Sequence, residues 1–117
     1  MRKKDFKGRC EKKSLSKCKT VCKTYNPIQA AYADMLEMNE EILEFRCNVA
    51  LDGELEKDYM SDFVCTRLDG ELLVRECVER KLLGKPKTVA LLEMSRNYWC
   101  KHGVLDWGIV VNEAAEK

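Results

Sequence analysis

The sequence lacks several features that whole classes of function require. It has one histidine, His102, so no Ser–His or Cys–His pair supports a case for nucleophilic catalysis. It has no glycine-rich phosphate loop, because its six glycines are scattered singly along the chain. It has no run of 18 apolar residues, so we expect no transmembrane helix. The basic start of the chain is not followed by an apolar stretch, so we expect no secretory signal and a cytoplasmic location.

Length and composition indicate one folded domain. The chain has 117 residues, of which 45% are hydrophobic and 35% charged, as is usual for a globular protein with a highly charged surface. We predict a basic N-terminal arm with a short helix over 1–24, the helix lying within 12–24. The remaining residues, 25–117, should form an α/β core.

The net charge of +1 conceals a strong asymmetry. Residues 1–25 hold ten basic and two acidic side chains, a balance of +8, and the remaining residues hold 11 basic and 18 acidic ones, a balance of −7. A basic arm on an acidic body favours a polyanionic partner, most naturally DNA or a nucleoprotein complex. The alternative is an arm that is merely solvated or that folds against its own acidic body. The candidate nucleic-acid contacts are Arg2, Lys3, Lys4, Lys7, Arg9, Lys12, Lys13, Lys17, Lys19 and Lys23.

Seven cysteines are many for this length, but their odd number and a reducing compartment argue against a disulfide framework. We interpret Cys47, Cys65 and Cys77, which lie in strand-like runs, as small buried hydrophobic residues.

Three other cysteines lie close together in the basic arm, and these are Cys10, Cys18 and Cys22. They could hold Zn²⁺ if Cys100 or His102 supplied a fourth ligand. The chain has no Cys-x-x-Cys pair, however, and helical spacing would make Cys18 and Cys22 ordinary packing residues.

Turn and cap signals divide the rest of the chain into elements. Asn26-Pro27 predicts the start of a helix that ends near Met38 and buries Ile28, Ala31, Met35 and either Leu36 or Met38. Strands are predicted at about 44–50, 57–67, 71–79 and 107–111, and a second helix at about 86–102. This order predicts an α/β fold with a mixed sheet flanked by helices.

Two acidic residues lie inside predicted strands, Asp62 before the Asp69-Gly70 turn and Glu76 after it. Carboxylates are rarely buried unless they are paired or coordinate a metal. One alternative is therefore a structural ion pair, with Arg46, Arg75 or the basic arm as partner. The other is a site for Mg²⁺ or Mn²⁺, which oxygen ligands hold.

Four segments carry a family resemblance: Asn26-Pro27-Ile28-Gln29, residues 36–42, Tyr59-Met60-Ser61-Asp62-Phe63 and Arg75-Glu76-Cys77-Val78. In this order they resemble the N-terminal catalytic domain of TnsA-type transposon endonucleases. That family belongs to the PD-(D/E)xK superfamily with the restriction-endonuclease-like fold. The resemblance implies a mobile-element protein in which Asp62 and Glu76 bind a metal. It also implies a helix Glu where this chain has Gln29, and a strand Lys where it has Val78.

Those two departures predict an impaired nuclease that acts by binding DNA or a DNA-handling complex. A rescue is conceivable, because Lys81 is close downstream and Glu79-Arg80-Lys81 offers a shifted Glu-x-Lys. The chain would then be an active Mg²⁺- or Mn²⁺-dependent DNA endonuclease. A third alternative is an element-encoded inhibitor of a nucleoprotein complex, of the anti-defence type.

Overall fold

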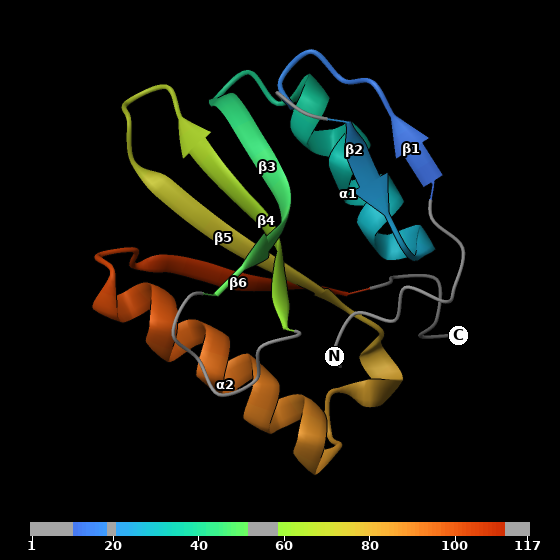
Figure 1. Ribbon diagram of the computed structural model, residues 1–117, viewed down its shortest axis with the longest axis vertical. Coiled ribbons are helices and arrows are strands. Elements are labelled where there is room, and N and C mark those ends of the chain that lie inside the picture. Colours follow the sequence, from blue (N-terminus) through green and yellow to red (C-terminus); the bar gives the residue numbers. More distant parts are fainter. Residues whose placement is uncertain (1–10, 19–20, 52–58, 112–117) are drawn as a thin grey trace.

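The fold is built on a four-stranded mixed sheet in the order β3-β4-β5-β6 (Figure 1). The computed structural model describes residues 11–18, 21–51 and 59–111. The strands β3, β4 and β5 are antiparallel neighbours, whereas β6 runs parallel to β5 and follows a helical crossover. The elements are β1 (Glu11–Lys13), β2 (Cys22–Thr24), α1 (Pro27–Met38), β3 (Ile42–Ala50), β4 (Met60–Arg67), β5 (Leu72–Val78), the 3₁₀ helix η1 (Arg80–Leu82), α2 (Pro86–Lys101) and β6 (Asp106–Val111).

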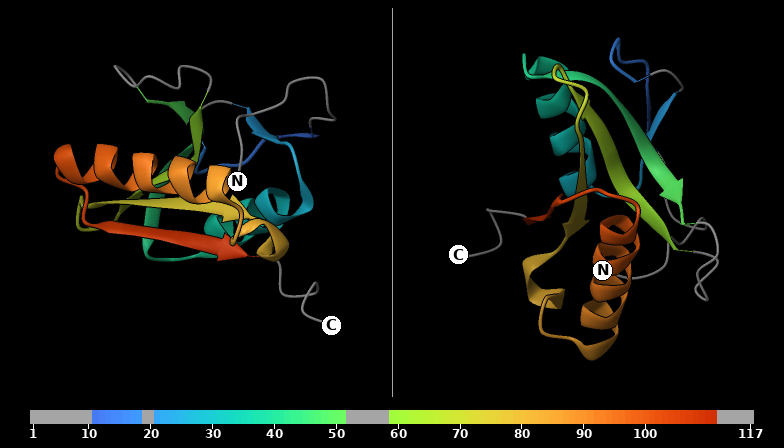
Figure 2. Two further views of the ribbon diagram at one scale, coloured as in Figure 1. Left: turned by 90° about the horizontal axis from the view of Figure 1, so that it is seen from below. Right: turned by 90° about the vertical axis from the view of Figure 1, so that its left-hand side faces the viewer.

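The two helices cover opposite faces of this sheet (Figure 2). Val64 of β4 packs in one apolar cluster with Leu91 of α2, and its neighbour Phe63 packs in another with Leu36 of α1. Such alternation follows from the two-residue repeat of a strand. The predicted α/β architecture, a mixed sheet flanked by helices, is therefore confirmed. Within the described residues, no helix is both long enough and apolar enough to cross a membrane.

Helix α1 begins where the sequence predicts. The Asn26 side chain accepts a hydrogen bond from the Gln29 N–H at 2.8 Å, and proline occupies the first turn. The predicted buried face is right at Ile28 and Leu36, but it is wrong at Ala31 and Met35, which are exposed. Gln29 is buried in their place, together with Ala33 and Leu36. The spacing of apolar residues misplaced part of this face because Gln29, a polar residue, has hydrogen-bond partners in Asn48 and the buried Asp62.

The short helix predicted within 12–24 is wrong. The structure instead pairs β1 with β2 in an antiparallel ribbon. Cys22 and Thr24 are buried while Lys23 is exposed, which is the two-residue repeat of a strand. The helical spacing of Cys18 and Cys22 was misleading, because Cys18 forms a bridge with Phe45 of β3 and Cys22 begins β2.

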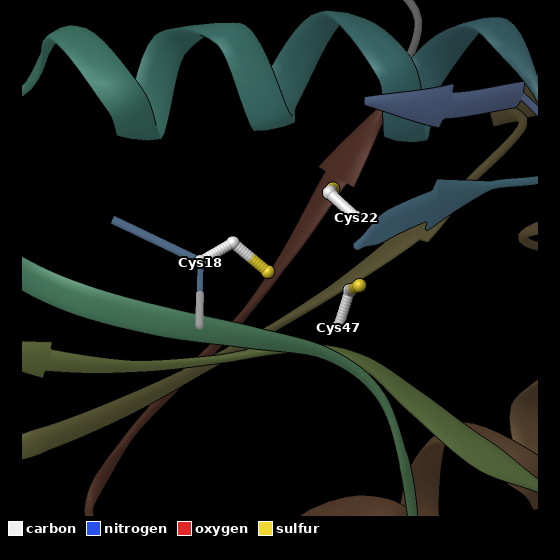
Figure 3. A group of neighbouring side chains, drawn as sticks. All are labelled: Cys18, Cys22 and Cys47. Atoms are coloured by element: carbon white, nitrogen blue, oxygen red, sulfur yellow. The ribbon is translucent and has the colours of Figure 1, made fainter. Parts of the chain in front are cut away.

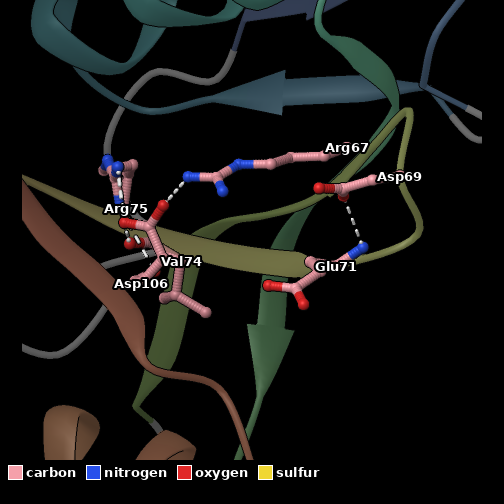
Figure 4. Close-up of polar contacts among 6 residues, drawn as sticks. All are labelled: Arg67, Asp69, Glu71, Val74, Arg75 and Asp106. Atoms are coloured by element: carbon pink, nitrogen blue, oxygen red, sulfur yellow. Dashed lines mark hydrogen bonds and ion pairs between the residues drawn. The ribbon is translucent and has the colours of Figure 1, made fainter.

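The start of β6 is tied to both preceding strands (Figure 4). Asp106 forms an ion pair with Arg75 of β5 at 2.8 Å and a second one with Arg67 of β4. The Arg75 side chain lies against Gly108 of β6, where a Cβ atom would meet it at 3.4 Å. The predicted turn between β4 and β5 is also present, with Gly70 at a φ of 90°. These contacts fix the register of β5, which carries Glu76.

The N-cap of α1 should be a measurable source of stability. We expect Asn26→Ala to lower the free energy of unfolding by about 1 kcal/mol, because the Gln29 N–H loses its acceptor. Urea denaturation of both proteins measures the difference. Asn97→Ala is the matched control, since Asn97 is exposed within α2 and alanine is a better helix former. Equal losses in both variants would contradict the assigned cap.

Candidate functional site

Asp62 of β4 and Glu76 of β5 are neighbours, and neither has any solvent exposure. The regular pairing of their strands ends at Phe63 and Arg75, just before these residues. There the Asp62 N–H donates to Glu76 Oε1 at 3.0 Å, and the Cys77 N–H donates to Asp62 Oδ2 at 2.7 Å. Side-chain carboxyl groups thus replace backbone carbonyls in holding this end of the two strands together.

Gln29 of α1 is the third fully buried member of the site. Its Nε2 atom donates to Asp62 Oδ1 at 3.2 Å and to Asn48 Oδ1 at 3.0 Å, and its Oε1 atom accepts from the Tyr25 N–H at 2.8 Å. A glutamate could make neither donation and would bring a second negative charge toward Asp62. The amide therefore suits this position better than the acid implied by the family resemblance.

Asn48 joins the site to the N-terminal ribbon. It lies within β3 at a φ of 56°, in the left-handed region that Asn enters more readily than most residues. Its Nδ2 atom donates to the Lys23 carbonyl at 2.7 Å, while its Oδ1 atom accepts from Gln29. Asn48 was not predicted as a site residue, and the one available signal was an asparagine inside a predicted strand.

On the α2 side, two serines and two tryptophans complete the polar contacts. The Ser95 hydroxyl donates to Glu76 Oε2 at 2.6 Å, and the Trp107 indole N–H donates to Ser95 Oγ at 3.1 Å. The Trp99 indole N–H donates to Ser61 Oγ at 2.9 Å. These residues were not predicted as members of the site. We call the hydrogen-bonded set Gln29, Asn48, Ser61, Asp62, Glu76, Ser95, Trp99 and Trp107 the carboxyl network.

The remaining positions of the expected nuclease motif lie elsewhere. Val78 is 2% exposed in the apolar cluster beneath α2, so it brings neither charge nor proton donor to the site. Lys81, the suggested replacement, is exposed on η1, and Glu79 of the shifted motif is exposed before it. The structure therefore brings together Gln29, Asp62 and Glu76, and it does not place Val78 or Lys81 among them.

The carboxyl network fits Mg²⁺ or Mn²⁺ poorly. Each carboxylate oxygen of Asp62 and Glu76 accepts a hydrogen bond, from Gln29, Cys77, Asp62 or Ser95. Mg²⁺ requires near-octahedral oxygen ligands and usually keeps several waters, which a fully buried and internally satisfied pair does not offer. The network is instead suited to holding α1, β4, β5 and α2 together.

Burial and the neighbouring charge favour the protonated form of Glu76. Loss of hydration is the larger cause and the charge of Asp62 the next, and together they raise the pKa of Glu76 to about 7. The hydrogen bonds from Ser95 and Ser61 act in the opposite direction. Protonation of one group of a close carboxyl pair removes the repulsion between them.

Three cysteines form a second cluster, which differs from the predicted one. The sulfur atoms of Cys18, Cys22 and Cys47 all lie within 4.8 Å of one another. Cys10 lies outside the described residues, and Cys100 is exposed on α2. Cys47 was interpreted as a buried hydrophobic residue, but it is only half-buried. A hydrogen bond from Cys22 lowers the pKa of Cys47 to about 6.

The basic segment is described only in part. Lys12 and Lys23 are directly opposite each other in the β1–β2 ribbon, and both are exposed. Lys17 is engaged elsewhere, because its Nζ atom donates to the Asn39 carbonyl at 2.6 Å. Lys13 belongs to β1. Arg2, Lys3, Lys4, Lys7, Arg9 and Lys19 lie outside the described residues.

Comparison with known proteins identifies no relative. No family model matches the chain, and the search of curated proteins found no match. The TnsA-type resemblance therefore stays a hypothesis.

Replacing Glu76 should change how stability depends on pH. The pKa of Glu76 is near 4.5 when unfolded and about 7 when folded, so the folded state holds an extra proton between these values. Stability from this group is therefore complete below pH 4.5 and is lost as the pH rises through 7. We expect Glu76→Gln to gain stability relative to wild type, on the order of 3 kcal/mol, between pH 4.5 and 8.

Urea denaturation at pH 4.5, 6 and 8 measures this gain. Glu93→Gln is the control, because Glu93 is exposed on α2 and its replacement should leave the pH profile unchanged. A constant difference between Glu76→Gln and wild type at all three values would contradict the raised pKa.

Proposed function

We propose that this protein is a non-cleaving member of the restriction-endonuclease-like proteins, related to TnsA-type transposon endonucleases, that acts by binding DNA or a nucleoprotein complex. The observation that carries the proposal is the carboxyl network. Asp62 and Glu76 lie on adjacent strands with Gln29 on the preceding helix, and all three are buried and bonded to one another. A mobile element would encode such a protein.

The order of elements supports the nuclease relationship. From α1 onward the chain runs helix, three antiparallel strands, helix and a strand parallel to the third. Gln29, Asp62 and Glu76 fall on the helix, the second strand and the third strand of that series. These are the elements on which the resemblance expects the helix acid, the strand Asp and the strand Glu.

The chemistry of the same residues argues against cleavage. Phosphodiester hydrolysis requires a metal or positioned charges to stabilise the charge that develops on the phosphate. Here Gln29 contributes no charge, Val78 replaces the lysine, and every oxygen of the two carboxyl groups is already used. Loss of one positioned group commonly lowers a rate by about 10²-fold or more. Loss of two should leave no measurable cutting.

Charge placement supports contact with a polyanion. Lys12 and Lys23 face each other across the β1–β2 ribbon, and directly opposed like charges destabilise a pair of strands. A phosphate backbone lying over the ribbon would remove this repulsion. The +8 balance of residues 1–25, against −7 for the rest, gives the N-terminal part of the sequence the opposite sign from the remainder.

We expect the protein to leave supercoiled plasmid intact in Mg²⁺ or Mn²⁺. The assay should be run at pH 8, where ionised Glu76 gives a metal its best chance of binding. Asp62→Asn is the control for contaminating nuclease, because it removes the charge but keeps the shape. Nicking by the wild type that Asp62→Asn abolishes would show an active endonuclease and contradict the proposal.

We also expect affinity for duplex DNA to fall steeply with salt. If six or more phosphates are contacted, fluorescence anisotropy should show a loss of about 10³-fold between 50 and 200 mM salt. The double variant Lys12→Glu, Lys23→Glu should reduce the slope of log affinity against log salt by about 2.

The matched control changes the same net charge elsewhere, with Lys87→Glu and Lys101→Glu on the exposed face of α2. It should retain most of the affinity and the salt slope. Equal losses in the two double variants, or a flat salt response of the wild type, would contradict a binding surface at the ribbon.

A further inference from the structure

Three cysteine side chains from separate segments converge between the N-terminal ribbon and the sheet (Figure 3). Cys18 lies in the loop between β1 and β2, Cys22 begins β2 and Cys47 lies in β3. Their sulfur atoms all lie within 4.8 Å of one another. Cys18 is 6% exposed and Cys22 fully buried, while Cys47 is half-buried, so solvent reaches the cluster at Cys47.

We propose that Cys18, Cys22 and Cys47 bind a thiophilic metal ion, Zn²⁺ in the first place, as three thiolate ligands. Thiolates are the protein ligands preferred by Zn²⁺, and oxygen-seeking ions such as Mg²⁺ do not compete for them. Zn–S bonds of about 2.3 Å in a tetrahedron place sulfur atoms about 3.8 Å apart, so small side-chain adjustments suffice. The fourth position would face the open side at Cys47.

The backbone that carries the three sulfur atoms is already held in place. The Phe45 N–H of β3 donates to the Lys17 carbonyl at 2.9 Å, which fixes the chain next to Cys18. Glu37 of α1 accepts from the Ser16 and Lys17 N–H groups, each at 3.1 Å, and anchors the same loop to the helix. A ligand set on a fixed backbone loses little conformational entropy when it takes up a metal.

The other two buried cysteines provide an internal comparison. Cys65 and Cys77 are as buried as Cys18, and they pack in the same apolar cluster as Cys18 and Cys22. Neither belongs to the three-sulfur group. Burial alone therefore does not bring thiols together in this protein. The close approach of Cys18, Cys22 and Cys47 comes from a loop and two strands that meet at one point.

This site uses none of the residues of the carboxyl network, so its test does not depend on the proposed relationship to nucleases. A metal there would join the basic ribbon to β3 and so stabilise the N-terminal segment on the sheet. It would bind only the deprotonated thiols, so uptake of the metal releases protons.

The test uses the full chain, fully reduced and freed of metal, titrated with Co²⁺ and then with Zn²⁺. We expect one Co²⁺ per chain, a near-ultraviolet thiolate-to-cobalt charge-transfer band and visible bands of tetrahedral intensity. Zn²⁺ should abolish these bands by displacement and raise the melting temperature. Absence of the charge-transfer band in the reduced wild-type protein would overturn the proposal, whatever the behaviour of any variant.

Two variants identify the ligands. Cys47→Ser should weaken the charge-transfer band, because only two thiolates remain. It should also weaken Zn²⁺ binding by more than about 100-fold, which exceeds the loss expected when a residue merely supports a ligand. Cys100→Ser, exposed on α2, should bind as the wild type does. Equal Zn²⁺ affinity of Cys47→Ser and Cys100→Ser would overturn the assignment. Should Cys47→Ser fail to fold, Cys18→Ser takes its place in the same comparison.

Discussion

The structure depends on burying two carboxyl groups without leaving their oxygen atoms unpaired. An unpaired buried polar group costs about 1–3 kcal/mol, and an unpaired charge costs more. Asp62 and Glu76 avoid this cost because α1, β4, β5 and α2 each supply a donor to them. The same contacts hold the strands together where their backbone pairing ends. The carboxyl network therefore connects the helices on both faces of the sheet through the sheet itself.

A network of this kind also limits what the residues can do chemically. A metal would have to displace Gln29 and Ser95 from the carboxyl oxygens, and each of these buried donors would then lose a charged acceptor. An acid in place of Gln29 would repel Asp62 and could not donate to Asn48. Gln29 is thus the residue that makes the buried acids compatible with a stable core. This compatibility is the physical basis for proposing a protein that binds without cutting.

Short sequence signals, such as helix caps and turns, were sufficient to predict most helices and strands. The cap at Asn26 and the turn at Gly70 placed α1 and the β4–β5 hairpin, because each depends on a few adjacent residues. The strand β2 was mistaken for helix because three residues are too few to establish a period. Its partner β1 lies nine residues or more before it in the chain, and the pairing stabilises both. The spacing of residues within one short segment does not reveal which distant strand will pair with it.

The site was predictable only where residue type alone carried the information. Asp62 and Glu76 were found because acids inside apolar strands are unusual. Asn48 and Cys47 were missed because their roles depend on which segment packs against β3. A cysteine in a strand is usually a packing residue, and it becomes a candidate ligand only when Cys18 and Cys22 are brought beside it.

The two clusters meet at β3, and this proximity has a consequence for the basic ribbon. Cys47 and Asn48 are adjacent, and Asn48 bonds to the carbonyl of Lys23, the residue after Cys22. The ribbon thus contacts the sheet at two neighbouring points. At one, the sulfur atoms of Cys22 and Cys47 lie close together. At the other is the side-chain amide of Asn48, which also accepts a hydrogen bond from Gln29. The ribbon itself has only two three-residue strands, too short to be stable alone. A metal bound by the three thiols would stabilise the ribbon, which carries Lys12 and Lys23, on the sheet. It would do so without altering the carboxyl network.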